Sequence, residues 1–190
     1  MRVMRMVAPA GHFKTSLELQ PKAEIYSDLG FVMARLGKSE TALADYQKAL
    51  ALDPSCASAH FNLAVAFVQA GKFGEAESHY RKALPGRPTA ETHNGLGYVL
   101  SRQDQTDEAV AEFRKAIDID PTFTPAYNNL AEALVRQGKL EEAEDYYKRS
   151  LAEKPSAAVY DALGAVLRKL GRPDEAAEQF GKAKVLEAAR

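Results

Sequence analysis

Residues 126–155 read AYNNLAEALVRQGKLEEAEDYYKRSLAEKP, and this stretch holds one complete copy of a pattern that recurs along the chain. Its second half carries Ala143, then Tyr147 four residues later, Ser150 three later and Pro155 five beyond. The block occurs five times: Ala42/Tyr46/Ala49/Pro54, Ala76/Tyr80/Ala83/Pro88, Ala109/Phe113/Ala116/Pro121, Ala143/Tyr147/Ser150/Pro155 and Ala176/Phe180/Ala183. The steps between the first alanines are 34, 33, 34 and 33 residues, a period that predicts stacked helical hairpins.

The first half of each copy has an aromatic residue or histidine, then Leu followed by Gly or Ala, then another large apolar residue. The five sets are Tyr26/Leu29/Gly30/Met33, His60/Leu63/Ala64/Phe67, His93/Leu96/Gly97/Leu100, Tyr127/Leu130/Ala131/Leu134 and Tyr160/Leu163/Gly164/Leu167. Spacings of three and four place them on one face of a helix. The small residue predicts a close approach of the second helix, so a bulky side chain at Gly97 or Ala131 should force the two helices apart.

Glycine separates the two halves of four copies, where a helix ends with a positive φ that costs glycine little. These glycines are Gly37, Gly71, Gly138 and Gly171. The third copy has Asp104 there, which is a tolerated but less favourable choice. In the second copy Pro85 predicts that the second helix ends about a turn early.

These residues resemble the signature of the tetratricopeptide-repeat family from about Ala23 to the end of the chain. The resemblance implies an all-α fold, a right-handed α-solenoid of five helix-turn-helix repeats with an N-terminal half-repeat. We expect an extension or half-repeat cap at 1–22 and a five-repeat solenoid at 23–190. The expected repeats are about 23–56, 57–89, 90–123, 124–156 and 157–190.

Composition limits the classes of partner and compartment. With 25 basic and 26 acidic residues, the chain has no broad attraction for nucleic acid or an anionic membrane. Cys56 is the single cysteine, which excludes an internal disulfide and is compatible with a reducing compartment. No apolar run is long enough to span a bilayer, and Arg5 interrupts the apolar start too early for a signal peptide. We therefore expect a cytoplasmic protein without membrane insertion, with the periplasm left open.

The resemblance implies that first helices line a concave groove in which ligand contacts are made. On that face the N-terminal half offers apolar side chains and the C-terminal half basic ones, which predicts a partner with apolar and then acidic residues. The predicted peptide-binding residues are Phe31, Phe61, Asn62, Val65, Tyr98, Arg102, Asn128, Asn129, Arg136 and Lys169.

Two groups on this face have structural alternatives. Asn62 and Asn129 are equivalent and form part of a row similar to the asparagine ladder of O-linked N-acetylglucosamine transferases, which would hold a peptide backbone. Asparagine is also frequent at this place in the family at large. The basic residues equally suit the end of a helix, where they complement its dipole. Of the clamp that binds heat-shock chaperone tails, only Asn62 has a counterpart, so that specificity is not expected.

The sequence offers no catalytic or metal-binding pattern. His60 and His93 stand where the family usually has Trp or Tyr, so we expect them to pack between helices. His12 and His79 have no partner at metal-ligand spacing, and neither a phosphate-binding glycine loop nor a nucleophile elbow occurs. We therefore expect no enzyme activity, cofactor or metal.

The leading functional prediction is a protein-interaction scaffold that binds a peptide or protein segment in its groove. Replacing Phe61 and Asn62 together should abolish partner capture and leave the helices intact. Two alternatives stay open: a self-assembling module that associates through its terminal repeats, and an accessory or substrate-recognition domain of an enzyme such as a glycosyltransferase.

Overall fold

The computed structural model describes residues 22–189. The predicted half-repeat cap lies, except for Lys22, outside the described residues. Within them the chain is divided at Pro88/Thr89 into two compact units, which we call unit 1 and unit 2. We describe each unit by itself.

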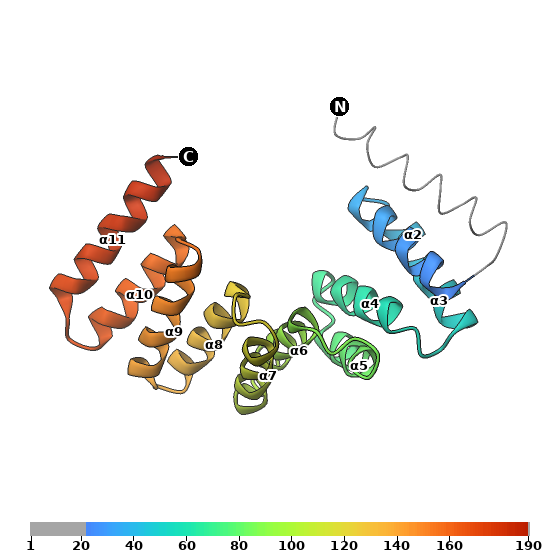
Figure 1. Cartoon of the computed structure of the whole chain (residues 1–190), viewed down its shortest axis with the longest axis horizontal. Coiled ribbons are helices and arrows are strands. Elements are labelled where there is room, and N and C mark those ends of the chain that lie inside the picture. The colour runs from blue at the N-terminus through green and yellow to red at the C-terminus, as the bar shows by residue number, and fades with distance from the viewer. Residues whose placement is uncertain (1–21, 190) are drawn as a thin grey trace. The chain divides into compact units, whose positions relative to one another are not determined.

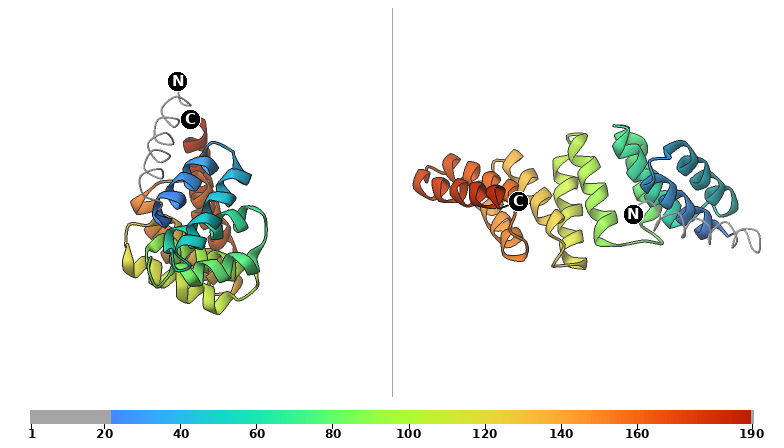
Figure 2. Two further views of the ribbon diagram at one scale, coloured as in Figure 1. Left: turned by 90° about the vertical axis from the view of Figure 1, so that its right-hand side faces the viewer. Right: turned by 90° about the horizontal axis from the view of Figure 1, so that it is seen from above.

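Both units consist of consecutive antiparallel helix hairpins (Figure 1). Unit 1 contains α2 (Ala23–Arg35), α3 (Ser39–Leu52), α4 (Ala57–Gln69) and α5 (Phe73–Ala83). Unit 2 contains α6 (Ala90–Arg102), α7 (Thr106–Ile119), α8 (Thr124–Arg136), α9 (Leu140–Glu153), α10 (Ala157–Lys169) and α11 (Pro173–Ala188). The views in Figure 2 show the two helices of a hairpin, such as α6 and α7, lying side by side. The five predicted hairpins are thereby confirmed between residues 22 and 189.

The turns between paired helices have the predicted left-handed backbone. Gly37, Gly71, Gly138 and Gly171 have φ values of 76°, 72°, 76° and 75°, and Asp104 adopts the same conformation with φ 60°. A side chain at positive φ is strained, whereas glycine has no Cβ to clash. Every hairpin thus closes in the same way, although one does so with an aspartate.

Small residues bring the helices of a hairpin into close contact. A Cβ added to Gly97 would lie 2.7 Å from Cε1 of Phe113 and 3.1 Å from the carbonyl oxygen of Ala109. Gly30 and Gly164 face the rings of Tyr46 and Phe180 in the same way. The recurring aromatic residue of the second helix therefore fills the space that the small residue of the first helix leaves.

The second helix of the second repeat is short, as Pro85 predicts. α5 has 11 residues, whereas α3, α7 and α9 each have 14. A proline inside a helix lacks the donor and clashes with the preceding turn. The segment after Ala83 consequently leaves the helix and carries Arg87 back toward α4, where its guanidinium lies 4.3 Å from the ring centre of Phe61.

Histidine replaces tyrosine in the core without losing a hydrogen bond. In α8, the Tyr127 hydroxyl donates to the carbonyl oxygen of Pro121 over 2.9 Å. His60 occupies the equivalent place in α4, is 5% exposed, and its Nε2 lies 3.0 Å from the carbonyl oxygen of Pro54. A carbonyl only accepts, so Nε2 of His60 carries the proton. The prediction that His60 packs between helices is confirmed.

The two other described histidines are partly buried, His79 in the same hairpin as His60 and His93 in the α6–α7 hairpin. Nδ1 of His79 lies 3.0 Å from Nδ1 of His60, and the tautomer of His60 that donates from Nε2 accepts a hydrogen bond from His79 at this nitrogen. His93 also packs between helices, with Nδ1 2.7 Å from Oε2 of Glu112. Burial opposes ionisation of Glu112, but hydrogen bonds from Lys115 and His93 lower its pKa overall. Each histidine therefore makes a structural contact within its hairpin.

The His60–His79 pair should make unit 1 less stable in mild acid. Burial, together with His60 and Lys82, lowers the pKa of His79 below its ordinary value of 6.5. As pH falls below 6.5 the unfolded chain takes up this proton first, so stability decreases until the lower folded pKa is passed. His79→Tyr introduces the residue that Tyr146 provides at the equivalent position of another repeat. Between pH 7 and pH 5, we expect the urea concentration at the unfolding midpoint to fall less in this variant than in the natural chain. An equal fall in both proteins would contradict this assignment.

Candidate functional site

Asparagines on the first helices connect one repeat to the next. The Asn62 side-chain amide on α4 donates to Oγ of Ser27 on α2 over 3.1 Å. In unit 2, the Asn129 amide on α8 donates to Oδ1 of Asn94 on α6 over 2.9 Å. Both bonds join residues 35 apart and have the same register. These asparagines are therefore partly occupied in holding adjacent repeats together.

Asn128 shows what happens where the donor is missing. It is equivalent to Ser27 and Asn94, and its buried Oδ1 has no hydrogen-bond partner among residues 22–189. The donor position in the next repeat is taken by Ala162, which has no side-chain amide. The row of asparagines is consequently interrupted at this repeat.

Unit 1 contains a pocket of about 590 Å³ at the ends of α2 and α4 and the start of α3. Four of the predicted residues line it: Phe31, Phe61, Asn62 and Val65. Its other lining residues are Ala34, Arg35, Ser39, Ala42, Leu43, Tyr46, Ala66, Phe67, Gln69, Ala70 and Lys72. Burial, reinforced by Asp45, raises the pKa of Tyr46 to about 12, so its hydroxyl is neutral at pH 7.

The aromatic residues of this pocket differ in exposure. Phe31 on α2 is 48% exposed, although it is large and apolar. Phe61 on α4 is partly buried, and its ring meets the ring of Tyr80 edge-on at 5.8 Å between centroids. Phe31 is therefore available to a partner, whereas Phe61 also supports the hairpin.

Two cations lie at the rim of the unit 1 pocket. The guanidinium carbon of Arg35 is 5.9 Å from the ring centre of Phe31, and Nζ of Lys72 is 6.0 Å from that of Phe67. These separations are at the outer limit of cation–π contact. No aspartate or glutamate belongs to the pocket lining, so the charge of the rim is positive.

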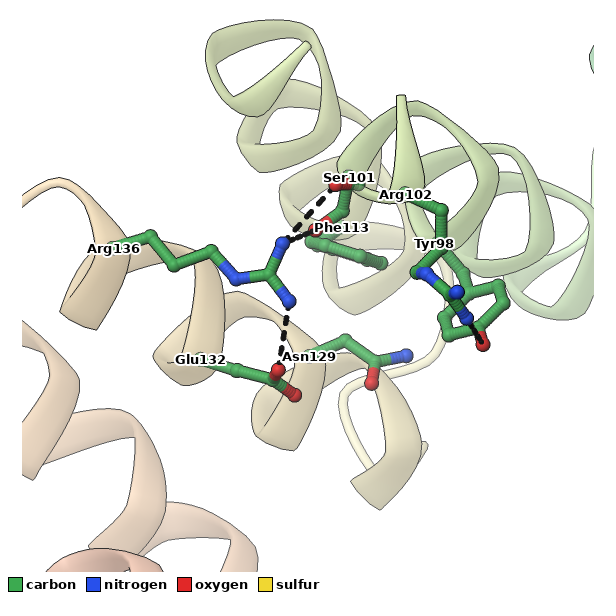
Figure 3. Close-up of a pocket in the computed structure, with 7 residues that line it drawn as sticks. All are labelled: Tyr98, Ser101, Arg102, Phe113, Asn129, Glu132 and Arg136. Atoms are coloured by element: carbon green, nitrogen blue, oxygen red, sulfur yellow. Dashed lines mark hydrogen bonds and ion pairs between the residues drawn. The ribbon is translucent and has the colours of Figure 1, made fainter. Parts of the chain in front are cut away.

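Unit 2 has a second, smaller pocket of about 360 Å³ between α6 and α8 (Figure 3). It brings together four of the predicted residues, Tyr98, Arg102, Asn129 and Arg136. Ser101, Phe113 and Glu132 complete the lining. The predicted residues Asn128 and Lys169 line neither pocket.

Arg136 is held in place by both helices of the unit 2 pocket. Figure 3 shows its guanidinium reaching toward Ser101, where Nη1 donates to the backbone oxygen over 3.1 Å and to Oγ over 3.2 Å. Its Nη2 donates to Glu132 over 3.0 Å. Across the pocket, Arg102 donates to the Tyr98 hydroxyl over 2.9 Å. The charge of Arg136 is thus compensated within the chain.

Sequence reasoning missed Lys72 and Ser101 as parts of these pockets, whereas Glu132 lies on the predicted groove face. Glu132 and Arg136 are spaced as an i,i+4 ion pair, which the sequence alone displays. Ser101 follows from no sequence pattern, because its contact with Arg136 joins residues 35 apart.

The described residues contain neither a metal-binding cluster nor a helix suited to a membrane. Between residues 22 and 189, no group of three or more His, Cys, Asp or Glu side chains is arranged to hold a metal ion. None of the described helices combines the length and apolar character that crossing a bilayer requires.

The chain is similar to several known proteins. It is 30% identical over 152 residues to the type IV pilus assembly protein PilF of Pseudomonas aeruginosa, covering 77% of this chain and 60% of PilF. It is 28% identical over 151 residues to the human protein O-mannosyl-transferase TMTC1, covering 77% of this chain but 17% of TMTC1. The chain therefore spans less than two thirds of each of these relatives.

Among solved structures, the chain is similar to YrrB, a TPR protein with an unusual peptide-binding site. The TM-score is 0.79 at 26% identity, and the match covers 92% of this chain and 91% of YrrB. This likeness and the hairpins of both units confirm the expected helical solenoid.

Family models agree with the repeat pattern along most of the chain. Three models described as tetratricopeptide repeat match residues 34–91, 100–167 and 156–185. The matched segments contain the recurring alanines, aromatic residues and turn residues described above. The chain is a member of the tetratricopeptide-repeat family.

Proposed function

We propose that the chain is a protein-interaction scaffold that binds an extended segment of a partner protein along its first helices. The observation that carries the proposal is the unit 1 pocket, where an exposed aromatic side chain, Phe31, stands beside a cavity of about 590 Å³. Ligand pockets commonly have volumes of about 300–1,000 Å³ with apolar linings and a few polar groups. The unit 1 pocket has this character.

Similar proteins support a binding role. YrrB is a TPR protein with a peptide-binding site, and PilF takes part in type IV pilus assembly. Among the predicted alternatives, the scaffold accounts for Phe31 together with the cavity beside it, which has the size of a ligand pocket. TMTC1 is named as a transferase, but the match covers 17% of it. We therefore propose a binding role without catalysis. The single cysteine, Cys56, is buried and free, which fits a reducing compartment, and we propose the cytoplasm.

The partner we propose has apolar residues and acidic residues. Phe31, Phe61 and Val65 provide apolar contacts in the unit 1 pocket. The partly exposed Asn62 keeps its amide oxygen for a backbone N–H, since only its nitrogen is used by Ser27.

Phe31 offers a clean test of this role. Because its side chain is 48% exposed, Phe31→Ser should change the stability of the fold little and remove a large apolar contact. We expect the immobilised full chain to capture specific proteins from an extract of its source cells. The variant should capture about tenfold less of these proteins.

The matched control is Leu52→Ser, because Leu52 is 49% exposed at the end of α3 and lines neither pocket. Quantitative mass spectrometry of the captured proteins compares the three baits. If the same proteins bind equally to both variants and to the natural chain, the first-helix binding site is wrong.

A further inference from the structure

The charged residues at equivalent places on the first helices differ in what faces them. Arg35, Arg102 and Arg136 occupy the last turn of α2, α6 and α8. The residues four positions earlier are Phe31, Tyr98 and Glu132. In unit 2, Arg136 forms an ion pair with Glu132. In unit 1, Arg35 has Phe31 in that place, and a phenyl ring does not cancel its charge.

Lys72 repeats this situation on the other side of the unit 1 pocket. It comes directly before α5 and lies near the ring of Phe67. Within residues 22–189, neither Arg35 nor Lys72 makes an ion pair. The pocket thus carries two uncompensated cations above an aromatic and aliphatic lining.

We propose that the unit 1 pocket recognises a partner segment in which a large apolar residue stands next to an aspartate or glutamate. This inference rests on the proposed scaffold function and names the chemistry of its partner. The apolar side chain occupies the cavity among Phe31, Val65 and Phe67, and the carboxylate lies between the cations of the rim.

Charge complementarity distinguishes this occupant from a purely apolar one. Apolar surface alone would favour any hydrophobic segment, but two unpaired cations in a lining without carboxylates favour a negative neighbour. Hydrogen bonds between charged groups are about twice as strong as neutral ones. The basic residues of the C-terminal half predicted acid recognition there, but Arg136 is already paired with Glu132 and Lys169 lines neither pocket, so we place the acidic contact in unit 1.

The test is selection of a displayed library of random dodecapeptides on the immobilised full chain. We expect selected peptides to share a large apolar residue adjacent to Asp or Glu. A fluorescent synthetic copy of the best peptide should bind about tenfold more weakly to the double variant Arg35→Gln, Lys72→Gln, and selection on that variant should keep the apolar residue and lose the acidic one.

The matched control is Lys139→Gln, Lys154→Gln, because Lys139 holds the position equivalent to Lys72 in another repeat, and both lysines are exposed and line neither pocket. Circular dichroism confirms that both double variants are folded. Unchanged affinity in the control, together with a weaker salt dependence in the Arg35/Lys72 variant, supports the proposal.

The results that contradict acidic recognition differ from the result that contradicts peptide binding. Selected peptides that are apolar without an acidic neighbour, or an acidic preference that survives in the Arg35/Lys72 variant, would overturn this inference and leave the scaffold function standing. A preference for a free C-terminal carboxylate over an internal acidic residue would also overturn it. No enrichment on the folded natural chain would instead overturn peptide binding itself.

Discussion

Gly97→Ala is expected to destabilise unit 2 by about 1–3 kcal/mol, even though alanine is the better helix former by about 1 kcal/mol. The added methyl group would lie 2.7 Å from Cε1 of Phe113, a distance that requires one of the two groups to move. Phe113 is 1% exposed, so a shift of its ring disturbs the side chains packed around it. The backbone oxygen of Ala109, 3.1 Å away, limits movement on the other side.

A glycine elsewhere in the chain serves as a matched control. Gly181 lies within α11, and a Cβ placed there has no neighbour within 4 Å. Gly181→Ala should therefore stabilise the protein by about 0.5–1 kcal/mol through helix propensity alone. Urea unfolding measures both changes. Opposite signs are expected, and equal stabilisation by both variants would contradict the close contact of α6 with α7.

Phe61→Ala is expected to destabilise unit 1 by about 2–4 kcal/mol. The ring is partly buried against Tyr80 and also carries the guanidinium of Arg87, so its removal leaves a void and deprives the arginine of its platform. Nε of Arg87 is buried and has no hydrogen-bond partner in the described part of the chain. Phe61→Ala would thus remove the aromatic contact of the Arg87 guanidinium.

A variant that lacks both Phe61 and Asn62 would lose structural contacts as well as binding contacts. Replacing Phe61 and Asn62 together was expected to leave the helices intact, but both residues hold repeats or helices together. Thermal unfolding followed by circular dichroism should show a large loss for Phe61→Ala and little for Phe31→Ser. If Phe61→Ala unfolds at the temperature of the natural chain, its structural role is wrong, and the double variant is again a valid test of binding.

The sequence was sufficient to predict the helices, the turns and the contacts within each hairpin. Period, turn glycines and the Leu-small pair each depend on residues within one repeat, which is why even Asp104 could be assigned a positive φ. Pro85 likewise acts on its own helix. Local rules of this kind do not depend on how one repeat meets the next.

The candidate site was predicted only in part. The sequence placed Phe31, Phe61, Asn62 and Val65 on one face, and they line one pocket. It did not reveal that Arg136 is bound to Ser101, because that bond depends on how far α6 and α8 are displaced along each other. Whether a charged side chain is compensated is set by such neighbours, and a list of residues on a face does not contain them.

The hydrogen bond from His60 or Tyr127 to the proline carbonyl before its helix suggests how such a chain can diverge. Two chemically different side chains keep the same donor in the same place, so drift at this position need not break the repeat. Core positions can differ in sequence between repeats while the hydrogen bond that fixes the start of the helix is kept. A repeat can then acquire new surface residues on a frame that already tolerates substitution.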